Sequence, residues 1–488
     1  MKSSLGRLGG ACSTPMAAEI VHEPAEAEAE ADVVVVGGGI AGLSAAWRLR
    51  HREVLLLEAG DRGGGRLRSD PRGDYWLNFG AHLFPAPGSV VDTMAREFDL
   101  ETVPVTGSMM GLAVDDTKLN RGRVETYPLR LPLSVRERWA FAMAGLKVQR
   151  AVRRYHRLAT RAPGETAADV RARVLAFEDD RSFADFLGPL PPAVGEIFAC
   201  AARRSTAELT ELSAGCGVGL FALVWGGKGS LIARNLLGGA GRLPEALARA
   251  LGERARTRCR VTKLRPEGER VLVRYDHDGR PRQIRARHVV MAAEAPHAAA
   301  LVAPVARQAA EALAQLTYGA FLSVAVETGE TSAMPWDDIY AMATPGRAFD
   351  MFTNQAHALR ASPSRRPGGS LMLFSGAQNA QRLMAESDET IVDQFLDDLH
   401  ALYPQSRSIV VHTAVHRWPL GNVYAKPGRH VLQAALEGPH GEHRNLHLAG
   451  DYFAELGSME AAAKTGKTAA DQVEALLHER PRGAVVSA

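Results

Sequence analysis

The stretch DVVVVGGGIAGLSAAWRLR, residues 32–50, constrains the fold of this chain more than any other segment. Residues 33–36 form a β-branched apolar run, which is typical of a buried parallel strand. Gly37, Gly39 and Gly42 follow with the spacing GxGxxG, and apolar residues then recur at helical spacing. We therefore predict a strand, a tight turn and a helix whose first free N–H groups face an anion.

Each of these glycines has its own role in such a turn. Gly37 permits the tight turn, Gly39 lets the backbone approach a pyrophosphate, and Gly42 lets the helix pack against the strand. A second strand-like run, EVLLLEA, contains Glu58 about 20 residues after the first glycine, where an acidic residue binds a ribose hydroxyl. A plain glycine turn is the alternative, but Glu58 favours a dinucleotide site in an α/β, Rossmann-like domain.

Length and composition limit the remaining classes. With 488 residues the chain exceeds one ordinary core, so two or three lobes are expected. Its 46% hydrophobic and 23% charged residues are typical of a soluble globular protein, and a net charge of +3 is too small to predict a nucleic-acid partner. The four cysteines are scattered without a CxxC pair, so we predict neither a metal site nor a disulfide framework, and a cytoplasmic location fits.

The first 30 residues differ from the rest of the chain. They contain the acidic low-complexity tract PAEAEAEA and have no apolar core of signal-peptide length. We expect residues 1–30 to be a disordered leader, and a true start at Met16 is the alternative. No apolar run reaches the roughly 18 residues that are needed to span a bilayer.

Two further segments suit a dinucleotide. The first, AGDRGGGRLRS, puts Arg66 after three glycines, and a guanidinium beside exposed N–H groups suits a phosphate; a basic surface loop is the alternative. The second, NLHLAGDYFAELGSMEAAAKTGKTAADQVEAL, predicts a strand at 446–448, then Asp451, then a helix over 459–477. Such a carboxylate can bind polyol hydroxyls and a helix N-terminus can stabilise negative charge on a ring, although an ordinary strand–loop–helix unit has the same pattern.

Together these segments resemble one family. VVVVGGGIAGLSAAWRL, VLLLEAGDRGGGRLRS and LHLAGDYF…GSMEAAAKTGKTAA are similar to the flavin-containing amine oxidase superfamily, which includes protoporphyrinogen oxidases and carotenoid-type desaturases. GRLPEALARAL with CRVTKL resembles its middle FAD segment, and SFADFL and HRWPLGNVYAKPG resemble further segments. The resemblance extends over most of residues 32–477 and implies FAD rather than NAD.

The resemblance also implies residue roles. Glu58 would bind the adenosine ribose, and Val261 would contact the adenine side through its backbone. Asp451 would bind the ribityl–pyrophosphate region, and Met459 with Glu460 would lie by the isoalloxazine. The cofactor-binding residues that we expect are Gly37, Gly39, Ile40, Ala41, Gly42, Glu58, Ala59, Gly64, Gly65, Arg66, Gly80, Ala81, His82, Val261, Gly450, Asp451, Ser458, Met459, Glu460 and Ala463.

The same resemblance implies the organisation of the chain. A discontinuous FAD-binding domain takes residues 31–85, 230–300 and 430–480. The insertions at 86–229 and 301–429 would form a mixed α+β substrate-binding lobe. The first insertion contains helical runs such as SVRERWAFAMAGLKVQRAVRRYHRL, and the second contains strand-like runs such as FLSVAVET and SLMLFSG with one helix at ETIVDQFLDDLHALY.

A basic helix is predicted in the first insertion. Residues 147–161 carry one lysine and five arginines, directly after the apolar run WAFAMAGL. A weak membrane-surface contact, and so a peripheral location, is one interpretation. A solvated basic face with the acidic residues 178–180 as its partner is the plainer one.

Few residues offer acid–base chemistry. His82 lies in NFGAHLFP, which the resemblance places where the chain passes the flavin, and its intrinsic pKa near neutrality suits a base or a group that orients the substrate. A histidine held by a backbone carbonyl is the plainer interpretation. Tyr318, Trp418 and Tyr424 are candidates to line the substrate pocket, although core aromatic residues need no such function.

Departures from the monoamine oxidases refine the expected chemistry. No cysteine occurs in HRWPLGNVY, where those enzymes attach FAD, so we expect FAD to be noncovalent. Ser458 stands where their aromatic cage has a tyrosine, and the run LTYGAFLSVAVET lacks the lysine that many amine oxidases place near the flavin. These departures favour a desaturase-like or protoporphyrinogen-oxidase-like reaction in an apolar pocket.

The expected function is that of an FAD-dependent oxidoreductase. It would take a hydride from a bulky, largely apolar small molecule and pass electrons to O2 or another acceptor. An amine or amino-acid oxidase is the first alternative. A redox-neutral flavin-dependent isomerase and a noncatalytic flavoprotein are the others.

Overall fold

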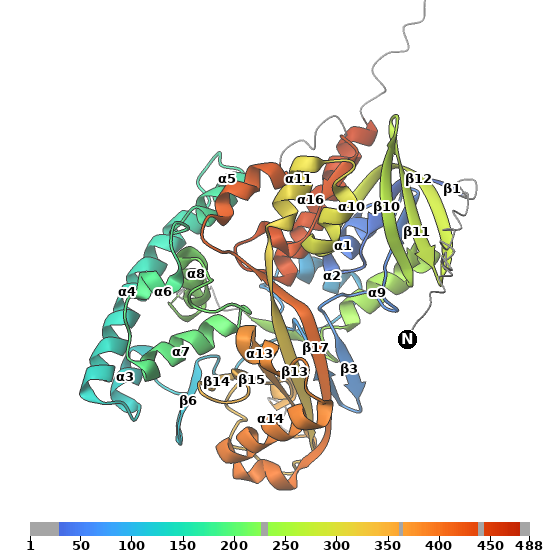
Figure 1. The fold of residues 1–488 in the computed structure, drawn as a ribbon. Coiled ribbons are helices and arrows are strands. Elements are labelled where there is room, and N and C mark those ends of the chain that lie inside the picture. Colours follow the sequence, from blue (N-terminus) through green and yellow to red (C-terminus); the bar gives the residue numbers. More distant parts are fainter. Residues whose placement is uncertain (1–28, 226–232, 361–364, 438–443, 479–488) are drawn as a thin grey trace, which may run out of the picture.

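The computed structural model describes residues 29–225, 233–360, 365–437 and 444–478. These residues form two seven-stranded sheets, two strand pairs and a group of helices, which lie side by side in Figure 1. The predicted leader, residues 1–28, lies outside the described residues. Residues 29 and 30, which we assigned to that leader, are instead the first two residues of a strand, β1, because their backbones pair with a neighbouring strand.

The first sheet has seven strands in the order β10-β11-β12-β1-β2-β9, and β18 pairs with the end of β12. Pairing is parallel among β18, β12, β1, β2 and β9, and antiparallel along β10, β11 and β12. The valines at 33–36 are buried, as predicted for a central parallel strand. The strands are β1 (Ala29–Val36), β2 (Val54–Leu57), β9 (Ala255–Arg256), β10 (Cys259–Glu267), β11 (Arg270–His277), β12 (Arg280–Met291) and β18 (Leu446–Leu448).

Helices cover both faces of this sheet. Val34 and Val36 of β1 belong to one core, whereas Val33 and Val35 belong to the core on the opposite face, as the period of a strand requires. The first core includes α10 (Ala295–Val302) and α11 (Arg307–Ala314). The second includes α1 (Ile40–Arg48), α2 (Val90–Glu97), α9 (Arg242–Leu251) and α16 (Met459–His478).

These two cores extend past the predicted domain edges. α2 falls inside the range 86–229 and α11 inside 301–429, yet both pack their apolar faces against the first sheet. The strand pair β5 (Thr102–Pro104) and β8 (Arg234–Leu236) also joins the first insertion to the second FAD segment. The elements that pack on the first sheet therefore extend beyond the bounds that the resemblance implies.

The second sheet has seven strands in the order β17-β13-β16-β15-β14-β6-β7. Its long antiparallel strands run through the lower half of Figure 1, and α14 lies beside them. The strands are β6 (Gly111–Val114), β7 (Thr117–Leu119), β13 (Thr317–Thr328), β14 (Ala341–Ala343), β15 (Met351–Asn354), β16 (Gly369–Gly376) and β17 (Val410–Tyr424). The helices near it are α12 (His357–Arg360), α13 (Ala377–Leu383) and α14 (Asp388–Leu402), and a hairpin pairs β3 (Ser69–Arg72) with β4 (Tyr75–Asn78).

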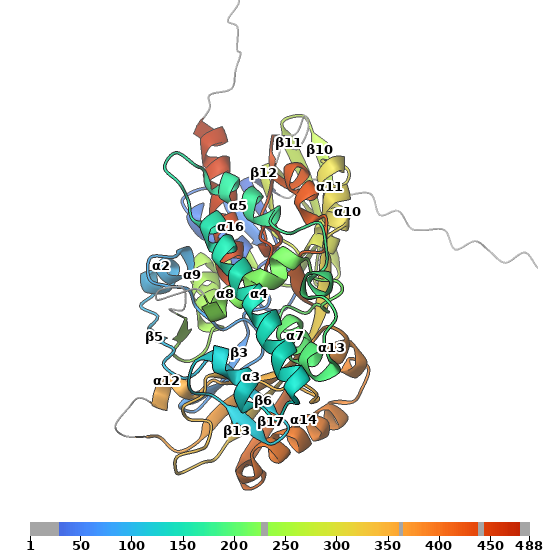
Figure 2. The ribbon, with the colours of Figure 1, turned by 90° about the vertical axis from the view of Figure 1, so that its left-hand side faces the viewer.

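The remaining helices form one group, which faces the viewer in Figure 2. Its longest member, α4 (Val135–Ala159), crosses the front of that view and begins at a capping box between Ser134 and Glu137. The predicted helix in this region is therefore confirmed as one continuous element. The others are α3 (Tyr127–Arg130), α5 (Ala167–Leu175), α6 (Phe183–Leu187), α7 (Pro192–Arg203) and α8 (Ala214–Trp225). The short helix α15 (Gln433–Glu437) instead packs in the first core, beside α11.

Candidate functional site

The turn between β1 and α1 has the geometry that its glycines predict. Gly37 has φ +104°, and a Cβ there would lie 2.8 Å from the backbone of Ala292. A Cβ on Gly42 would lie 1.9 Å from the carbonyl oxygen of Gly37, so only glycine allows this close helix packing. Gly39 differs from both, because a Cβ there would meet nothing within 4 Å. The open position and the uncapped start of α1, which includes Ile40 and Ala41, fit a pyrophosphate.

Glu58 lies at the end of β2, directly across from this turn. Its carboxylate accepts a hydrogen bond from the backbone N–H of Gly38 at 2.6 Å and another from Gly60 at 2.6 Å. The intervening Ala59 is exposed. The backbone carbonyl of Glu58 accepts from Cys259 N at 2.7 Å, which places β10 and its bulge at Val261 on the same side. These contacts bring the predicted ribose and adenine residues together.

The second glycine cluster lies against the first. Gly64 donates from its N–H to the carbonyl oxygen of Gly38 at 2.8 Å, and Gly64 and Gly39 form a parallel bridge. Gly64 and Gly65 both have positive φ, +107° and +52°. The cluster therefore packs against the turn between β1 and α1, and it is not the basic surface loop that we considered as an alternative. We call these two glycine segments, residues 37–42 and 63–65, the cradle.

Arg66 connects this cradle to the C-terminal segment. Its guanidinium forms an ion pair with Asp451 at 2.9 Å and lies 5.8 Å from the ring of Tyr318. It also donates to the carbonyl oxygen of Gly421 at 3.4 Å. Burial opposes the charge, but the nearby carboxylate of Asp451 outweighs it and raises the pKa of Arg66. The Arg66 head group therefore stays cationic at the centre of the predicted cofactor site.

The start of α16 is held by hydrogen bonds to the segment before it and by packing against α1. The Gly450 N–H donates to Thr465 Oγ1 at 2.9 Å, and Ser458 Oγ accepts from the N–H of Ala461 at 3.1 Å. Met459 and Ala463 are buried against α1. α16 thus begins beside Asp451, as the predicted site requires.

Glu460 has a different side-chain role from the one that the resemblance implies. Its carboxylate accepts hydrogen bonds from the backbone N–H groups of Val90 and Val91, both at 3.1 Å. These N–H groups open α2, so Glu460 stabilises a helix N-terminus and its negative charge complements the helix dipole. Only the backbone of Glu460 remains for a contact with a flavin ring.

His82 is held by its own loop. Its Nδ1 lies 2.8 Å from the carbonyl oxygen of Gly80, so Nδ1 carries the proton and Nε2 is an acceptor. Nε2 is buried and has no hydrogen-bond partner among the described residues. Burial lowers the pKa of His82, which keeps the ring neutral at physiological pH. The adjacent Ala81 donates to the carbonyl oxygen of Arg66 at 3.0 Å, which ties this loop to the cradle.

A tyrosine and an asparagine that the sequence analysis missed support His82. The Tyr340 ring lies 6.1 Å from the His82 ring, and Asn235 donates to the carbonyl oxygen of His82 at 3.1 Å and to Tyr340 Oη at 2.9 Å. Both side chains are buried. They come from chain segments far from His82, so local sequence carried no signal for them.

The three predicted pocket aromatics do not gather in one place. Trp418 donates to the carbonyl oxygen of Phe79 at 2.8 Å and packs near Gly80, whereas Tyr424 packs in the helical core and donates to Glu211 at 3.2 Å. Tyr318 accepts from the N–H of Ala295 at 3.3 Å and faces Arg66. Trp418 therefore lies by the loop of Gly80, Tyr318 lies by Arg66, and Tyr424 is a core residue.

The structure shows an apolar cavity whose lining residues the sequence analysis did not name. It has a volume of about 340 Å³ and lies between α3, α4, α7 and α8 and the edges of β6, β14 and β15. Met109, Ala343 and Met351 of its wall also belong to the apolar cluster that contains Tyr340, whose ring lies 6.1 Å from the His82 ring. Other lining residues include Tyr127, Phe141, Leu146, Phe198, Arg204 and Phe221.

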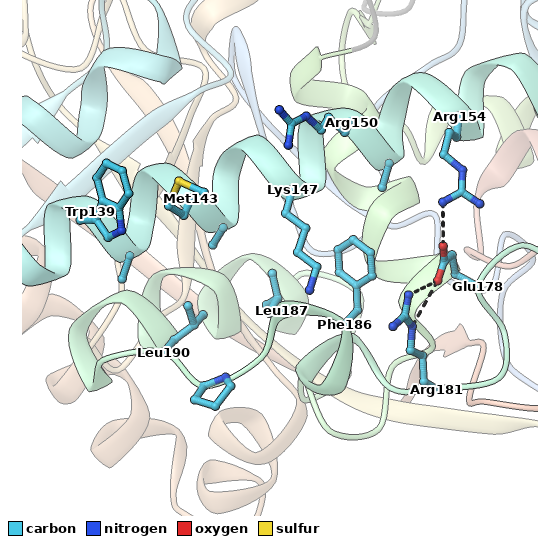
Figure 3. A pocket seen from close by; sticks show the side chains of 14 residues that line it. Trp139, Met143, Lys147, Arg150, Arg154, Glu178, Arg181, Phe186, Leu187 and Leu190 are labelled. Atoms are coloured by element: carbon cyan, nitrogen blue, oxygen red, sulfur yellow. Dashed lines mark hydrogen bonds and ion pairs between the residues drawn. The ribbon is translucent and has the colours of Figure 1, made fainter.

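A second, more open groove of about 650 Å³ runs along the outside of α4 (Figure 3). Trp139, Met143 and Lys147 line it from α4, and Phe186 lines it from α6. At its end the predicted ion pair is present, because Arg154 lies 3.1 Å from Glu178. Lys147 and Arg150 line the same groove, and the exposed apolar side chains of Trp139 and Met143 lie on the same helix.

Neither a membrane-spanning helix nor a metal-binding cluster is present among the described residues. Helices in this part of the chain include none that is long and apolar enough to cross a bilayer. The same residues contain no group of three or more histidine, cysteine, aspartate or glutamate side chains that could hold a metal ion.

The model of one protein family, flavin-containing amine oxidoreductases, matches residues 40–474. The chain belongs to this family. L-Amino-acid oxidase of Crotalus adamanteus is 41% identical over 71 residues, which are 14% of this chain and 14% of that protein. Flavin-containing amine oxidase A of Sus scrofa is 26% identical over 275 residues, 50% of this chain and 46% of that protein. The sequence matches therefore span less than half the length of either relative.

Solved structures of this family share the fold over nearly their whole length. A putrescine oxidase with bound putrescine has a TM-score of 0.72 and 18% identity, over 91% of this chain and 99% of that one. A candidate protoporphyrinogen oxidase from Exiguobacterium sp. 255-15 has a TM-score of 0.68 and 18% identity, over 91% and 98%. At this identity the likeness concerns the fold alone. The predicted family and the α/β fold class are confirmed, and an oxidoreductase that uses a flavin agrees with the family.

Proposed function

We propose that this protein is an FAD-dependent oxidoreductase that takes a hydride from a bulky, largely apolar organic substrate. The observation that carries the proposal is the apolar cavity of about 340 Å³, whose wall shares an apolar cluster with Tyr340, a neighbour of His82. Apolar walls with few polar groups suit a substrate that is held by shape and burial. A small, strongly polar amine would find few partners in such a cavity.

Residues at the β1–α1 turn, at the end of β2 and before α16 fit FAD, bound without a covalent bond. The open position at Gly39 and the uncapped start of α1 suit the pyrophosphate, and Glu58 suits the adenosine ribose. Arg66 and Asp451 present paired charges for the ribityl and phosphate groups. When bound, the flavin supplies a hydride acceptor, whereas the protein supplies orientation and electrostatics.

The chain's own groups near the cavity orient a substrate and exclude water. His82 Nε2 offers one buried acceptor, which suits a substrate N–H or O–H. Because burial lowers the pKa of His82, this acceptor stays available at neutral pH. The apolar cluster around Tyr340 keeps the neighbouring wall dry.

Oxidation of an amine or amino acid is the second candidate. It is favoured by the names of the relatives, which include an L-amino-acid oxidase and a flavin-containing amine oxidase A. The neutral His82 would serve this reaction equally, as an acceptor for an amine proton. Two further alternatives, a redox-neutral isomerase and a noncatalytic flavoprotein, need no donor that reduces the flavin.

An anaerobic flavin-reduction screen tests the proposal. Purified holoprotein is mixed with porphyrinogens, polyenes, amines and amino acids, and the absorbance of the flavin is followed. We expect bleaching by a bulky apolar donor. Bleaching only by amines or amino acids would replace the proposal with the second candidate, and a protein that cannot be loaded with FAD would overturn both. Peroxide release in air then separates O2 from another acceptor.

We also propose that α3 and α4 form a weak contact with anionic membranes. Trp139 is 69% exposed and Met143 44%, and both are on α4 beside Lys147 and Arg150. Apolar side chains next to cations suit an interface with acidic head groups. Leu146 lines both this exposed face and the apolar cavity, so an apolar substrate would have a short path between them.

A further inference from the structure

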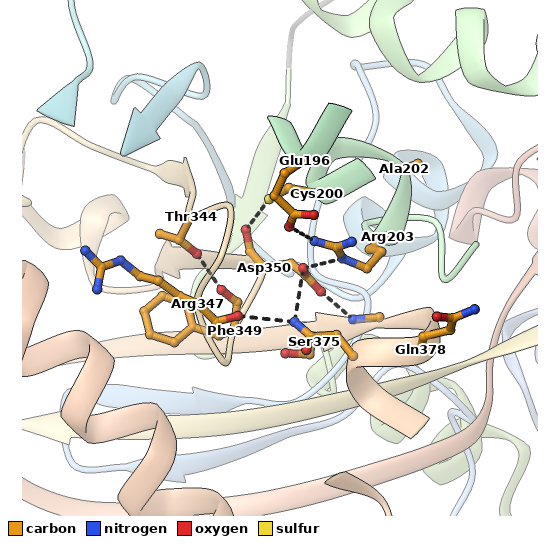
Figure 4. A network of polar contacts seen from close by, with 12 residues as sticks. Glu196, Cys200, Ala202, Arg203, Thr344, Arg347, Phe349, Asp350, Ser375 and Gln378 are labelled. Atoms are coloured by element: carbon orange, nitrogen blue, oxygen red, sulfur yellow. Dashed lines mark hydrogen bonds and ion pairs between the residues drawn. The ribbon is translucent and has the colours of Figure 1, made fainter. Parts of the chain in front are cut away.

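Two adjacent arginines at the end of α7 have opposite environments. Arg203 is surrounded by carboxylates, which Figure 4 shows in part. Its Nε lies 2.6 Å from Asp350, another nitrogen lies 3.7 Å from Glu208, and Glu196 forms a further ion pair. Arg203 thus joins the helices to β15 and is electrostatically satisfied.

Arg204 has no such partner. No carboxylate of the described residues lies within ion-pair distance of it. Its one hydrogen bond within the described chain goes to the carbonyl oxygen of Leu220 at 3.4 Å, although a guanidinium has five N–H donors. Burial lowers the pKa of Arg204, and no carboxylate opposes that shift.

Arg204 lines the apolar cavity. Glu125, the acidic residue of the same wall, is engaged elsewhere, because it accepts from Trp225 Nε1 and from Gln149 Nε2, both at 3.3 Å. Arg204 is half-buried, and a guanidinium that is partly shielded from water without a charged partner carries a desolvation cost that a bound anion would offset. The free donors of Arg204 therefore face a space that a ligand can enter.

We propose that Arg204 binds a carboxylate of the substrate, and that the substrate class is an apolar molecule with a carboxylate at one end. The planar guanidinium fits a carboxylate with two parallel N–H···O bonds. The apolar wall formed by residues such as Phe141, Phe198 and Phe221 fits the rest of the molecule. This inference rests on the proposed function and adds a charged end to its apolar substrate.

The position of Arg204 also orients the substrate. Two residues further on, Thr206 Oγ1 donates to the carbonyl oxygen of Asn422 at 3.1 Å, and the adjacent Gly421 accepts from Arg66. The α7–α8 connection therefore lies against β17 next to the predicted cofactor site. With its carboxylate on Arg204, a substrate extends along the cavity toward the cluster of Met109, Met351 and Tyr340.

Calorimetric titration of the holoprotein in the dark and without oxygen tests the inference. The ligands are 4-phenylbutyrate and dodecanoate, and each is compared with its neutral primary amide. We expect the carboxylates to bind the native protein tighter than the amides, and Arg204→Met to weaken them roughly ten- to hundredfold while the amides change little. Arg204→Lys should recover part of the loss. Arg150→Met, a change of a cation in the outer groove, serves as the matched control and should leave both classes unchanged.

The stability of the ligand-free variants distinguishes a binding role from a structural role. Arg204→Met should leave the Tm unchanged or raise it, because an unpaired, half-buried charge is removed. Arg203→Met should lower the Tm, because Asp350 loses its partner. A loss of stability in Arg204→Met, or equal binding of carboxylates and amides by the native protein, would overturn the inference. If carboxylates bind through Arg204 but no donor bleaches the flavin, the proposed function fails and the anion site stands.

Discussion

The guanidinium of Arg66 lies 2.9 Å from the carboxylate of Asp451, although 385 residues separate the two in the chain. Arg66 follows the second glycine cluster, and Asp451 follows the last strand of the first sheet. The ion pair therefore joins an N-terminal and a C-terminal segment of the chain at the predicted cofactor site. Each partner also compensates the buried charge of the other.

Replacement of Arg66 tests this pair. We expect Arg66→Met to lower FAD retention at least tenfold, since a cation beside the phosphates is lost and Asp451 is left unpaired. The flavin-to-protein ratio after desalting measures it. Arg66→Lys keeps the charge but not the planar guanidinium, so its FAD retention should lie between that of the native protein and that of Arg66→Met. Unchanged retention in both variants would contradict the site.

The part of the molecule around the β1–α1 turn could be predicted from the sequence, because the residues that specify it are close together in the chain. A glycine spacing, a β-branched run and an acidic residue about 20 positions later specify the turn, the strand and Glu58 without knowledge of the rest of the fold. The substrate half gave no such signal. Arg204, Tyr340 and the cavity are assembled from segments that meet only after folding.

Two glycines of the first turn separate cofactor binding from folding. Gly39→Trp should keep the fold and lose FAD, because Gly39 has an extended backbone with φ −67° and a side chain there has room in the absence of cofactor. Gly42→Ala should destabilise the protein itself, because its Cβ would collide with the Gly37 carbonyl oxygen at 1.9 Å. Thermal unfolding of both apoproteins checks the contrast. A Gly39→Trp variant that still binds FAD as the native chain does would refute the assignment.

His82 should produce a decline in activity on the acid side only. Its folded pKa is lower than the usual value near 6.5, so the ring is neutral above that pH, and protonation removes the Nε2 acceptor as the pH falls through the lowered value. Anaerobic flavin reduction by a neutral donor should therefore be flat from about pH 7 to 8 and fall only below about pH 6.5.

The matched variant for this prediction is His82→Gln. Glutamine keeps an acceptor but does not titrate in this range, so the acid decline should disappear even if the rate is lower at every pH. The acid decline would persist in His82→Gln if another group caused it. Rates measured by stopped-flow absorbance at constant ionic strength decide between these outcomes.

The exposed apolar face of α4 predicts binding to acidic vesicles. The double change Trp139→Ser and Met143→Ser should reduce cosedimentation with phosphatidylserine vesicles several-fold, because two side chains that would enter the interface are lost. Val411→Ser is the control, since Val411 is 66% exposed on β17, outside this face. Equal binding by phosphatidylcholine vesicles, or none by the native protein, would exclude an electrostatic membrane contact.

The arrangement of the first sheet has a consequence for synthesis of the protein. β1 lies between β2 and β12, while α1 is covered by α16, and the hydroxyl of Ser44 reaches the backbone of Ala463 at 2.9 Å. During synthesis, the glycine turn therefore leaves the ribosome long before β12 and α16, the elements that pack against β1 and α1, have been made. Cofactor capture is accordingly a late event, and a nascent chain that stalls before β18 exposes an apolar helix face that chaperones would need to shield.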